Sequence, residues 1–139
     1  MNKGFLSIPK GTCEVIEFYH SFIWIENDIV FGKYKPDLVI DLKVAKEIVR
    51  DRKTISKGIC KPFLLDVTGL LSVDAPARNY FASAEACEFL SAGAICTHNK
   101  LMAFLGNAWI LLDEPLIPTK VFTNKETGLK WLEPFKYQN

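Results

Sequence analysis

The segment Pro62–Ser83 constrains the fold of this chain more than any other stretch. It opens with a short apolar run, Phe63–Val67, that only Asp66 interrupts. Such a run between turn residues is typical of a strand buried on both faces, as in a parallel sheet. After a short loop, Asp74 lies two residues before a proline, and both residue types favour the start of a helix. The segment therefore predicts a buried strand, an acidic loop and a helix in succession.

Strand signals recur on both sides of this segment. Phe22–Ile25 and Ile29–Tyr34 are β-prone runs around a compact polar turn, which predicts a hairpin. Further strands are expected at three other runs: Cys13–Tyr19, Ala92–Thr97 and Thr119–Phe122. The order predicts one α/β domain over residues 1–139, with a hairpin region at 12–35 and an α/β core at 37–139 whose mixed sheet is covered by helices.

Helix signals fall between these strands. In addition to the helix at Asp74, three further apolar repeats each follow a capping residue, and these caps are Asp41, Asn99 and Thr123. In the first of these helices, a group of residues recurs at helical spacing, and its apolar members share one face. The group is Leu42, Ala45, Ile48, Val49 and Arg52. The helix after Asn99 is expected to pack through a second stripe: Leu101, Phe104, Leu105, Ala108 and Leu112. The helix after Asp74 is expected to break near Ser83 and to reach about Leu90.

Composition limits the function classes. The 139 residues carry a net charge of +1, which gives no global attraction to nucleic acid or to an anionic membrane. No apolar run approaches the ~20 residues of a membrane span, and Met1–Gly11 lacks a signal-peptide layout, so a cytoplasmic protein is expected. The cysteines lack zinc-site spacing and are expected to be buried, unpaired thiols: Cys13, Cys60, Cys87 and Cys96. No metal or other cofactor is predicted.

Two stretches resemble a known family. Leu65–Asp74 resembles the central segment of STAS domains, the SpoIIAA-like fold of anti-sigma-factor antagonists. Val121–Leu132 resembles the end of bacterial STAS/SEC14-like proteins of uncharacterised function. The overall likeness to the STAS fold covers roughly residues 41–139. The resemblance implies a SpoIIAA-like fold and a bacterial protein that works by protein interaction. Ala75 and Pro76 occupy the positions where the family's switch proteins carry a phosphate-accepting serine, so that switch is not expected.

A candidate partner or ligand surface follows from the predicted topology. In open α/β sheets, ligands and partners usually meet the loops at the carboxyl ends of parallel strands. The residues expected there are Asp66, Thr68, Asp74, Arg78, His98 and Asn99. They would form an acidic and basic rim for a partner or a small anion. The alternative is structural: Asp74 and Asn99 cap helices, Arg78 pairs with a neighbouring carboxylate, and His98 is a solvated loop residue.

Catalysis has weaker support in the sequence. Asp66 and Asp74 would act as an acid–base pair only in a cleft that shifts their pKa values. Cys96 and His98 would need to contact each other to form a nucleophilic dyad. No Gly-rich phosphate loop follows a strand. The chain is therefore not expected to be an enzyme, and its basic helical cluster is interpreted as a solvated face: Lys43, Lys46, Arg50, Arg52, Lys53 and Lys57.

Aromatic residues suggest where a partner would bind. Phe22 and Trp24 in the hairpin are candidates for an exposed contact patch, whereas Trp109 and Trp131 lie on helical stripes and are expected in the core. An edge hairpin with apolar residues on both faces needs covering, which motivates a homodimer hypothesis.

The leading hypothesis from the sequence is a non-catalytic, regulatory protein-interaction domain. The alternative is a carrier of a lipid or another small apolar molecule, suggested by the STAS/SEC14-like resemblance and by the many Phe and Leu residues. An apolar pocket of about 300–1,000 Å³ would favour the carrier. A close-packed interior with an exposed apolar patch would favour protein interaction.

Overall fold

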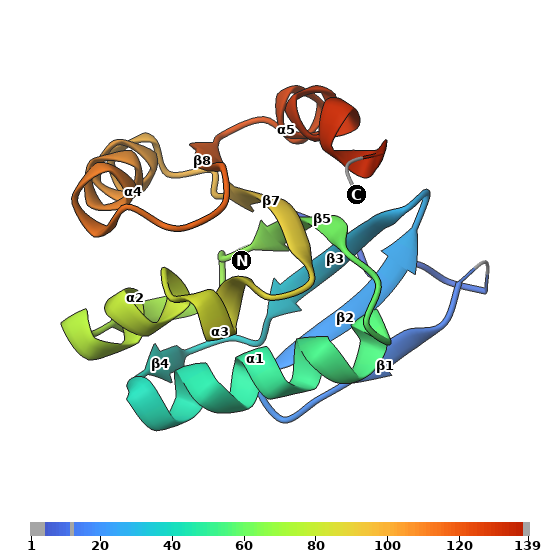
Figure 1. Ribbon diagram of the computed structural model, residues 1–139, viewed down its shortest axis with the longest axis horizontal. Coiled ribbons are helices and arrows are strands. Elements are labelled where there is room, and N and C mark those ends of the chain that lie inside the picture. Colours follow the sequence, from blue (N-terminus) through green and yellow to red (C-terminus); the bar gives the residue numbers. More distant parts are fainter. Residues whose placement is uncertain (1–4, 12, 138–139) are drawn as a thin grey trace.

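Six strands form one mixed sheet in the computed structural model, which describes residues 5–11 and 13–137 (Figure 1). In spatial order they are β1 (Val15–Glu17), β2 (Ser21–Glu26), β3 (Ile29–Tyr34), β5 (Lys61–Asp66), β7 (Leu90–Cys96) and β8 (Thr119–Phe122). β1–β3 form an antiparallel meander, and β3, β5, β7 and β8 are parallel. The predicted mixed sheet is therefore confirmed. Part of Met1–Gly11, the stretch considered for a signal peptide, lies outside the described residues.

Two short strands that the sequence did not predict form a second, parallel pair. They are β4 (Leu38–Ile40) and β6 (Leu70–Val73). The sequence predicted only a short loop between Val67 and Asp74, and this prediction is wrong for 70–73, which form β6. Each strand has only three or four residues, and β6 is not fully buried, so neither gives a clear periodic signal.

The predicted helices are present, with small differences at their ends. They are α1 (Leu42–Ser56), α2 (Ala75–Phe81), α3 (Ala84–Cys87), α4 (Lys100–Asp113) and α5 (Lys125–Leu132), followed by a 3₁₀ turn, η1 (Glu133–Tyr137). Asp41, Asp74 and Asn99 cap α1, α2 and α4 as predicted. Asn124 caps α5 in place of Thr123. Ser83 starts α3, so the predicted break is confirmed, but Leu90 belongs to β7 and not to a helix.

One face of the sheet, which we call the α5 face, carries the larger core. Leu64, Ala94 and Phe122 point from the strands toward Leu132 of α5. The N-terminal segment covers the same face. Trp24 is buried there and stacks on Phe31, with 5.6 Å between ring centroids. The hairpin therefore does not expose Trp24, and the prediction of a contact patch at this residue is wrong.

The opposite face, which we call the α1 face, is covered in two separate parts. α1 and α2 pack over the β3 side, where Tyr34, Ile48 and Ala77 belong to one buried cluster. α4 packs over β8 at the other side, and Figure 1 shows it apart from α2 and α3. The middle of this face, formed by β5 and β7, is only half-buried.

The direction predicted for the α4 stripe is wrong. Phe104 and Leu112 are 71% and 77% exposed, and Leu101 is exposed as well. The helix instead turns Ala103 and Gly106 toward the sheet, and a Cβ atom on Gly106 would lie 2.9 Å from Val121 Cγ2. Because α4 is apolar on nearly every side, hydrophobic spacing does not identify the packed face. The small residues identify it, since they allow the close approach to β8.

Two further expectations concern thiols and membrane spans. All four cysteines are free, and Cys87 and Cys96 are buried as predicted. Cys13 is only half-buried and Cys60 is exposed, so the prediction of burial is wrong for Cys60. Across residues 5–11 and 13–137, no helix has the length and apolar character required to cross a bilayer.

Candidate functional site: an apolar cleft on the α1 face

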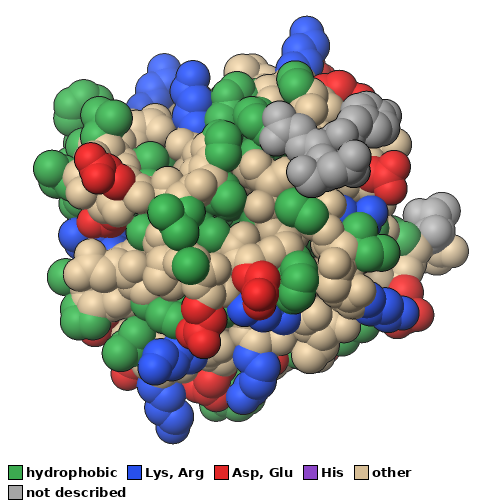
Figure 2. Space-filling model, in the orientation of Figure 1, with side chains coloured by type: hydrophobic (Ala, Val, Ile, Leu, Met, Phe, Trp, Pro, Cys, Tyr) green, Lys and Arg blue, Asp and Glu red, His purple; other side chains and the backbone are tan. Residues whose placement is uncertain are grey.

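An apolar cleft of about 270 Å³ opens between α1–α3 and α4. Phe63 and Leu65 of β5, with Gly93 and Ile95 of β7, form its floor. α1, the α2–α3 segment, α4 and residues 115–117 form its walls. In Figure 2, hydrophobic side chains gather over α4 and in the hollow beside it. Central strands of α/β sheets are normally covered on both faces, so a half-covered floor at β5 and β7 is a distinctive feature.

Among the polar side chains that line this mainly apolar space, Ser21, Tyr34 and Arg52 are buried. Ser21 and Tyr34 are register partners on β2 and β3, so their side chains lie side by side on the α1 face. Arg52 reaches the same cleft from α1. Within the part of the chain that the structure describes, Ser21 Oγ has no hydrogen-bond partner. All three side chains can donate hydrogen bonds.

Arg52 is 4% exposed, although it is a charged residue. Its guanidinium donates to the main-chain carbonyls of Ala86, at 2.8 Å, and Glu88, at 3.1 Å. Burial lowers the pKa of Arg52 to about 10, against the raising effect of nearby groups that include Cys87 and Glu88. The guanidinium therefore remains positively charged at neutral pH. The structure corrects the interpretation of Arg52 as part of a solvated basic face.

Arg78 links the two walls of the cleft. Its Nε lies 3.1 Å from Asp113 Oδ2 on α4, and its guanidinium carbon lies 5.0 Å from the centre of the Trp109 ring. All three residues line the cleft. Arg78 thus pairs with a carboxylate, as the structural alternative expected, and Trp109 belongs to the cleft wall and not to the closed core.

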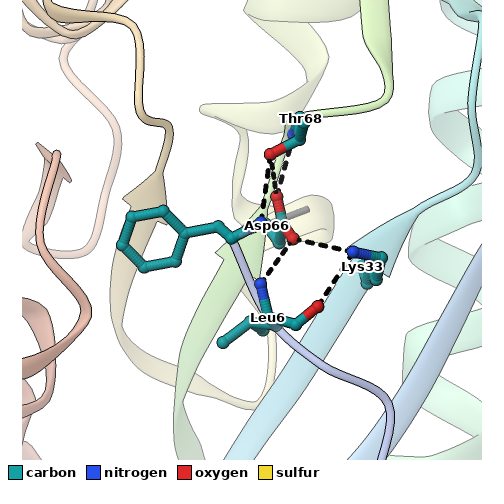
Figure 3. Close-up of polar contacts among 5 residues, drawn as sticks. Leu6, Lys33, Asp66 and Thr68 are labelled. Atoms are coloured by element: carbon teal, nitrogen blue, oxygen red, sulfur yellow. Dashed lines mark hydrogen bonds and ion pairs between the residues drawn. The ribbon is translucent and has the colours of Figure 1, made fainter. Parts of the chain in front are cut away.

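Asp66 ends β5, but its side chain lies on the α5 face and is completely buried, so it is not part of an exposed rim (Figure 3). Its carboxylate accepts from the Leu6 amide at 2.8 Å, the Thr68 amide at 2.9 Å and the Thr68 hydroxyl at 2.6 Å. Lys33 Nζ lies 3.2 Å away and also donates to the Leu6 carbonyl. Burial acts to raise the pKa of Asp66, but these hydrogen bonds and the Lys33 charge outweigh it and lower the pKa. Asp66 therefore fastens the N-terminal segment to the sheet.

The remaining predicted surface residues fall into separate places. Thr68 joins Asp66 and also accepts from the Phe5 amide at 3.3 Å. His98 is exposed and its ring lies 4.7 Å from the Phe5 ring. Asp74 and Asn99 accept from helix amides at 2.9 and 3.0 Å as caps. The structure thus brings Asp66, Thr68 and His98 together around the N-terminal segment, and places Asp74 and Arg78 on α2.

The groups considered for catalysis are occupied in other ways. Asp66 holds the N-terminal segment and Asp74 caps α2. Burial, with the charge of Asp66, raises the pKa of the Cys96 thiol to about 12, so it stays protonated at neutral pH. In the described stretches of the chain, no group of three or more His, Cys, Asp or Glu side chains is placed to hold a metal ion.

Sequence reasoning missed the cleft and the role of Ser21, Tyr34 and Arg52 in lining it. Only one signal pointed to it: Arg52 shares helical spacing with Ile48 and Val49, so a charged residue was expected among inward-facing ones. The cleft itself exists because α4 stands apart from α2 and α3 except where Arg78 bridges α2 and α4, and no local pattern encodes that gap.

Comparisons with known proteins show the family and the fold. A family model described as a domain of unknown function, DUF7793, matches residues 23–136, more than half of the chain. No curated protein sequence matches the chain. A solved structure from Shewanella loihica PV-4, an uncharacterised DUF3478 protein described as having a SpoIIAA-like fold, matches with a TM-score of 0.57. It is 16% identical, over 91% of this chain and 99% of that one. The fold that the sequence resemblance implied is confirmed, and the chain belongs to the DUF7793 family.

Proposed function

We propose that this protein is a non-catalytic binding domain that takes a small apolar molecule into the cleft on the α1 face. The observation that carries the proposal is the cleft itself, about 270 Å³ in volume and lined mainly by apolar side chains. Ligand sites usually measure about 300–1,000 Å³ and have mostly apolar walls with a few polar groups. The cleft is slightly smaller than that range, which suits a single slender chain or a small ring system.

The energetic argument rests on half-buried apolar residues at the centre of the fold. Phe63, Leu65 and Ile95 stay partly in contact with water, as does Trp109 on the wall. Each Å² of apolar surface left in water forgoes about 25 cal/mol of stabilisation. A ligand that covers this floor recovers that free energy without rearranging the closed core on the α5 face.

Filling the floor of the cleft is expected to weaken ligand binding strongly. A Cβ atom on Gly93 would meet only ordinary contacts, 3.9 Å from the Thr119 side chain, so Gly93→Leu can place its side chain in the cleft without displacing the backbone. We expect affinity for the neutral dye N-phenyl-1-naphthylamine to fall at least about tenfold, because the dye would lose apolar contact surface on the floor of the cleft. Fluorescence titration measures the affinity.

The matched control is Gly93→Ala, which adds one methyl group and should leave most of the dye affinity intact. Thermal unfolding of Gly93→Leu should show unchanged or raised stability, because cavity filling commonly stabilises by about 0.5–2 kcal/mol. Equal dye affinity in the wild type and in a folded Gly93→Leu variant would contradict the proposal.

A second candidate function is homotypic protein interaction through the outer face of α4. This outer stripe consists of exposed apolar residues of α4, together with Leu116 just after the helix: Leu101, Phe104, Leu111, Leu112 and Leu116. A helix with apolar residues on all sides usually has partners on all sides. The ends of α4 carry opposite charges, Lys100 at its start and Glu114 just after it. Two copies packed antiparallel about a two-fold axis would therefore bury the stripes and pair each Lys100 with the other copy's Glu114.

Sedimentation equilibrium tests this second candidate. Leu112→Glu is expected to raise the dimer dissociation constant at least about tenfold, because it buries an unpaired charge in the interface. Leu71→Glu, at an exposed leucine on β6, is the control and should have no effect. Lys100→Glu should weaken the dimer, and adding Glu114→Lys should restore it. A wild-type chain that stays monomeric at high concentration excludes the homodimer.

A further inference from the structure

Arg52 gives the cleft a chemical preference beyond apolar character. We infer that the ligand is an amphiphilic carboxylate, a molecule with an apolar chain and one carboxylate group, and that Arg52, Ser21 and Tyr34 receive the carboxylate. The inference rests on the proposed function, since it names the ligand class of the same cleft. It stands on the burial of Arg52, on the hydrogen-bond partners that Arg52 has, and on the hydroxyls of Ser21 and Tyr34 that line the same cleft.

The charge of Arg52 is the first observation. Arginine is almost never fully buried unless it is paired with an anion, because an isolated charge is costly to remove from water. Within residues 5–11 and 13–137, none of the ion pairs includes Arg52. Glu88, whose main-chain carbonyl accepts from Arg52, has its carboxylate 3.0 Å from Lys53. The two partners that Arg52 does have, the carbonyls of Ala86 and Glu88, are neutral dipoles.

The hydrogen-bond donors that line the cleft are the second observation. The guanidinium has five N–H donors, and the bonds to Ala86 and Glu88 use only part of them. Ser21 is 2% exposed, and its Oγ has no hydrogen-bond partner among the described residues. Burial raises the pKa of the Tyr34 phenol, against the lowering effect of the Arg52 charge, so the phenol stays protonated and can donate. A buried hydroxyl without a partner is costly, and an acceptor from a ligand would satisfy it.

The ligand class follows from combining these groups with the rest of the cleft. A set of donors with one full positive charge and no carboxylate of its own is complementary to an anionic acceptor. A carboxylate suits a guanidinium because its two oxygens match the planar donors. Apart from Arg78 and Asp113, which already pair with each other, the other walls and the floor are mainly apolar and fit the chain of such a molecule. A straight-chain monocarboxylate of medium length meets all three conditions.

The test compares two probes that differ only in the head group, decanoate and decan-1-ol, by isothermal titration calorimetry. We expect the wild type to bind decanoate at least about tenfold more tightly than decan-1-ol, as charge-assisted hydrogen bonds predict. Arg52→Met removes the charge and keeps an apolar side chain in its place. It should lower decanoate affinity to the level of decan-1-ol and leave decan-1-ol affinity unchanged.

Arg50→Met is the matched control, because Arg50 lies on the solvent side of the same helix and pairs with Asp51. It should leave both affinities as in the wild type. Arg52→Met also removes the bonds between α1 and residues 86–88, so Ser21→Ala, which deletes one hydroxyl, provides a second variant with little structural cost. It should lower decanoate affinity severalfold and spare decan-1-ol.

The outcomes separate this inference from the proposed function. Equal affinity of the wild type for both probes overturns the inference and leaves apolar binding in place. Binding of decanoate that neither Arg52→Met nor Ser21→Ala weakens also overturns it. Failure of the wild type to bind either probe overturns the inference and the proposed function together.

Discussion

Replacing Asp66 by alanine is expected to destabilise the protein by about 3–5 kcal/mol, the usual cost of removing one partner from a buried ionic network. The change would leave the Leu6 and Thr68 amides without their acceptor and would remove the anion that faces Lys33. Because the Asp66 carboxylate holds the N-terminal segment, Leu6 would lose its anchor on the α5 face. Urea unfolding measures the loss, and hydrogen exchange at the Leu6 amide should report local release.

Asp74→Asn is the control for this prediction. Asp74 accepts from the Ala77 amide as a helix cap, and asparagine caps almost as well as aspartate, so a change below about 0.5 kcal/mol is expected. A loss below about 1 kcal/mol for Asp66→Ala would contradict the anchoring role.

The same network predicts a pH dependence. The pKa of Asp66 is lower in the folded state than its ordinary value, so its ionised form is favoured by folding. Its contribution is complete above the unfolded-state pKa of about 3.9 and is lost as the pH falls through the lower, folded-state pKa. As the pH falls from about 5 to about 2, Asp66→Ala should therefore lose less stability than the wild type.

Replacing Gly69 by alanine is expected to have a comparable effect for a steric reason. A Cβ atom at this position would collide with the Lys35 carbonyl oxygen and would lie 2.7 Å from the Lys35 carbonyl carbon. These are backbone atoms, which cannot rotate away as a side chain can. The strand pair β4–β6 would have to shift, because the Leu38 amide donates to the Gly69 carbonyl at 3.0 Å. We expect a loss of about 3 kcal/mol, at the upper end of overpacking effects.

Thermal unfolding checks the Gly69 prediction, and the melting temperature should fall by roughly 10 °C. Gly93→Ala is the control, since its added methyl group meets only ordinary contacts and should change stability by less than about 1 kcal/mol. A Gly69→Ala variant as stable as the Gly93→Ala control would show that the close approach to Lys35 is not a constraint.

Much of the fold was predictable because its signals are local. Asp41, Asp74 and Asn99 each precede a helix and cap it, and the polar turn at Asn27 and Asp28 joins β2 to β3. The positive φ angles of these two turn residues, 53° and 62°, suit a tight hairpin. Alternation of these local elements with short connections is sufficient to indicate an α/β sheet with parallel strands.

The parts that could not be predicted depend on contacts between distant residues. The burial of Asp66 depends on the N-terminal segment that covers it, in which Leu6, sixty positions earlier, donates to its carboxylate. β6 forms only by pairing with β4, which lies some thirty residues away in the chain. The packed side of α4 is decided by Gly106 against Val121, and not by the larger residues that dominate the hydrophobic pattern. The cleft follows from that choice, since α4 then lies over β8 and leaves the middle strands half-covered.

The most direct test of the central claim is to locate a bound apolar molecule on the protein. Methyl-labelled protein titrated with decan-1-ol and followed by NMR would report each site separately. Our account predicts that chemical shifts change at methyl groups that line the cleft: Leu65, Ile95 and Ile110. It also predicts that the methyl groups of Leu101, Leu111 and Leu112, on the outer stripe of α4, stay unchanged. Shifts confined to the outer stripe, or no shifts at all, would contradict the assignment of the cleft as the binding site.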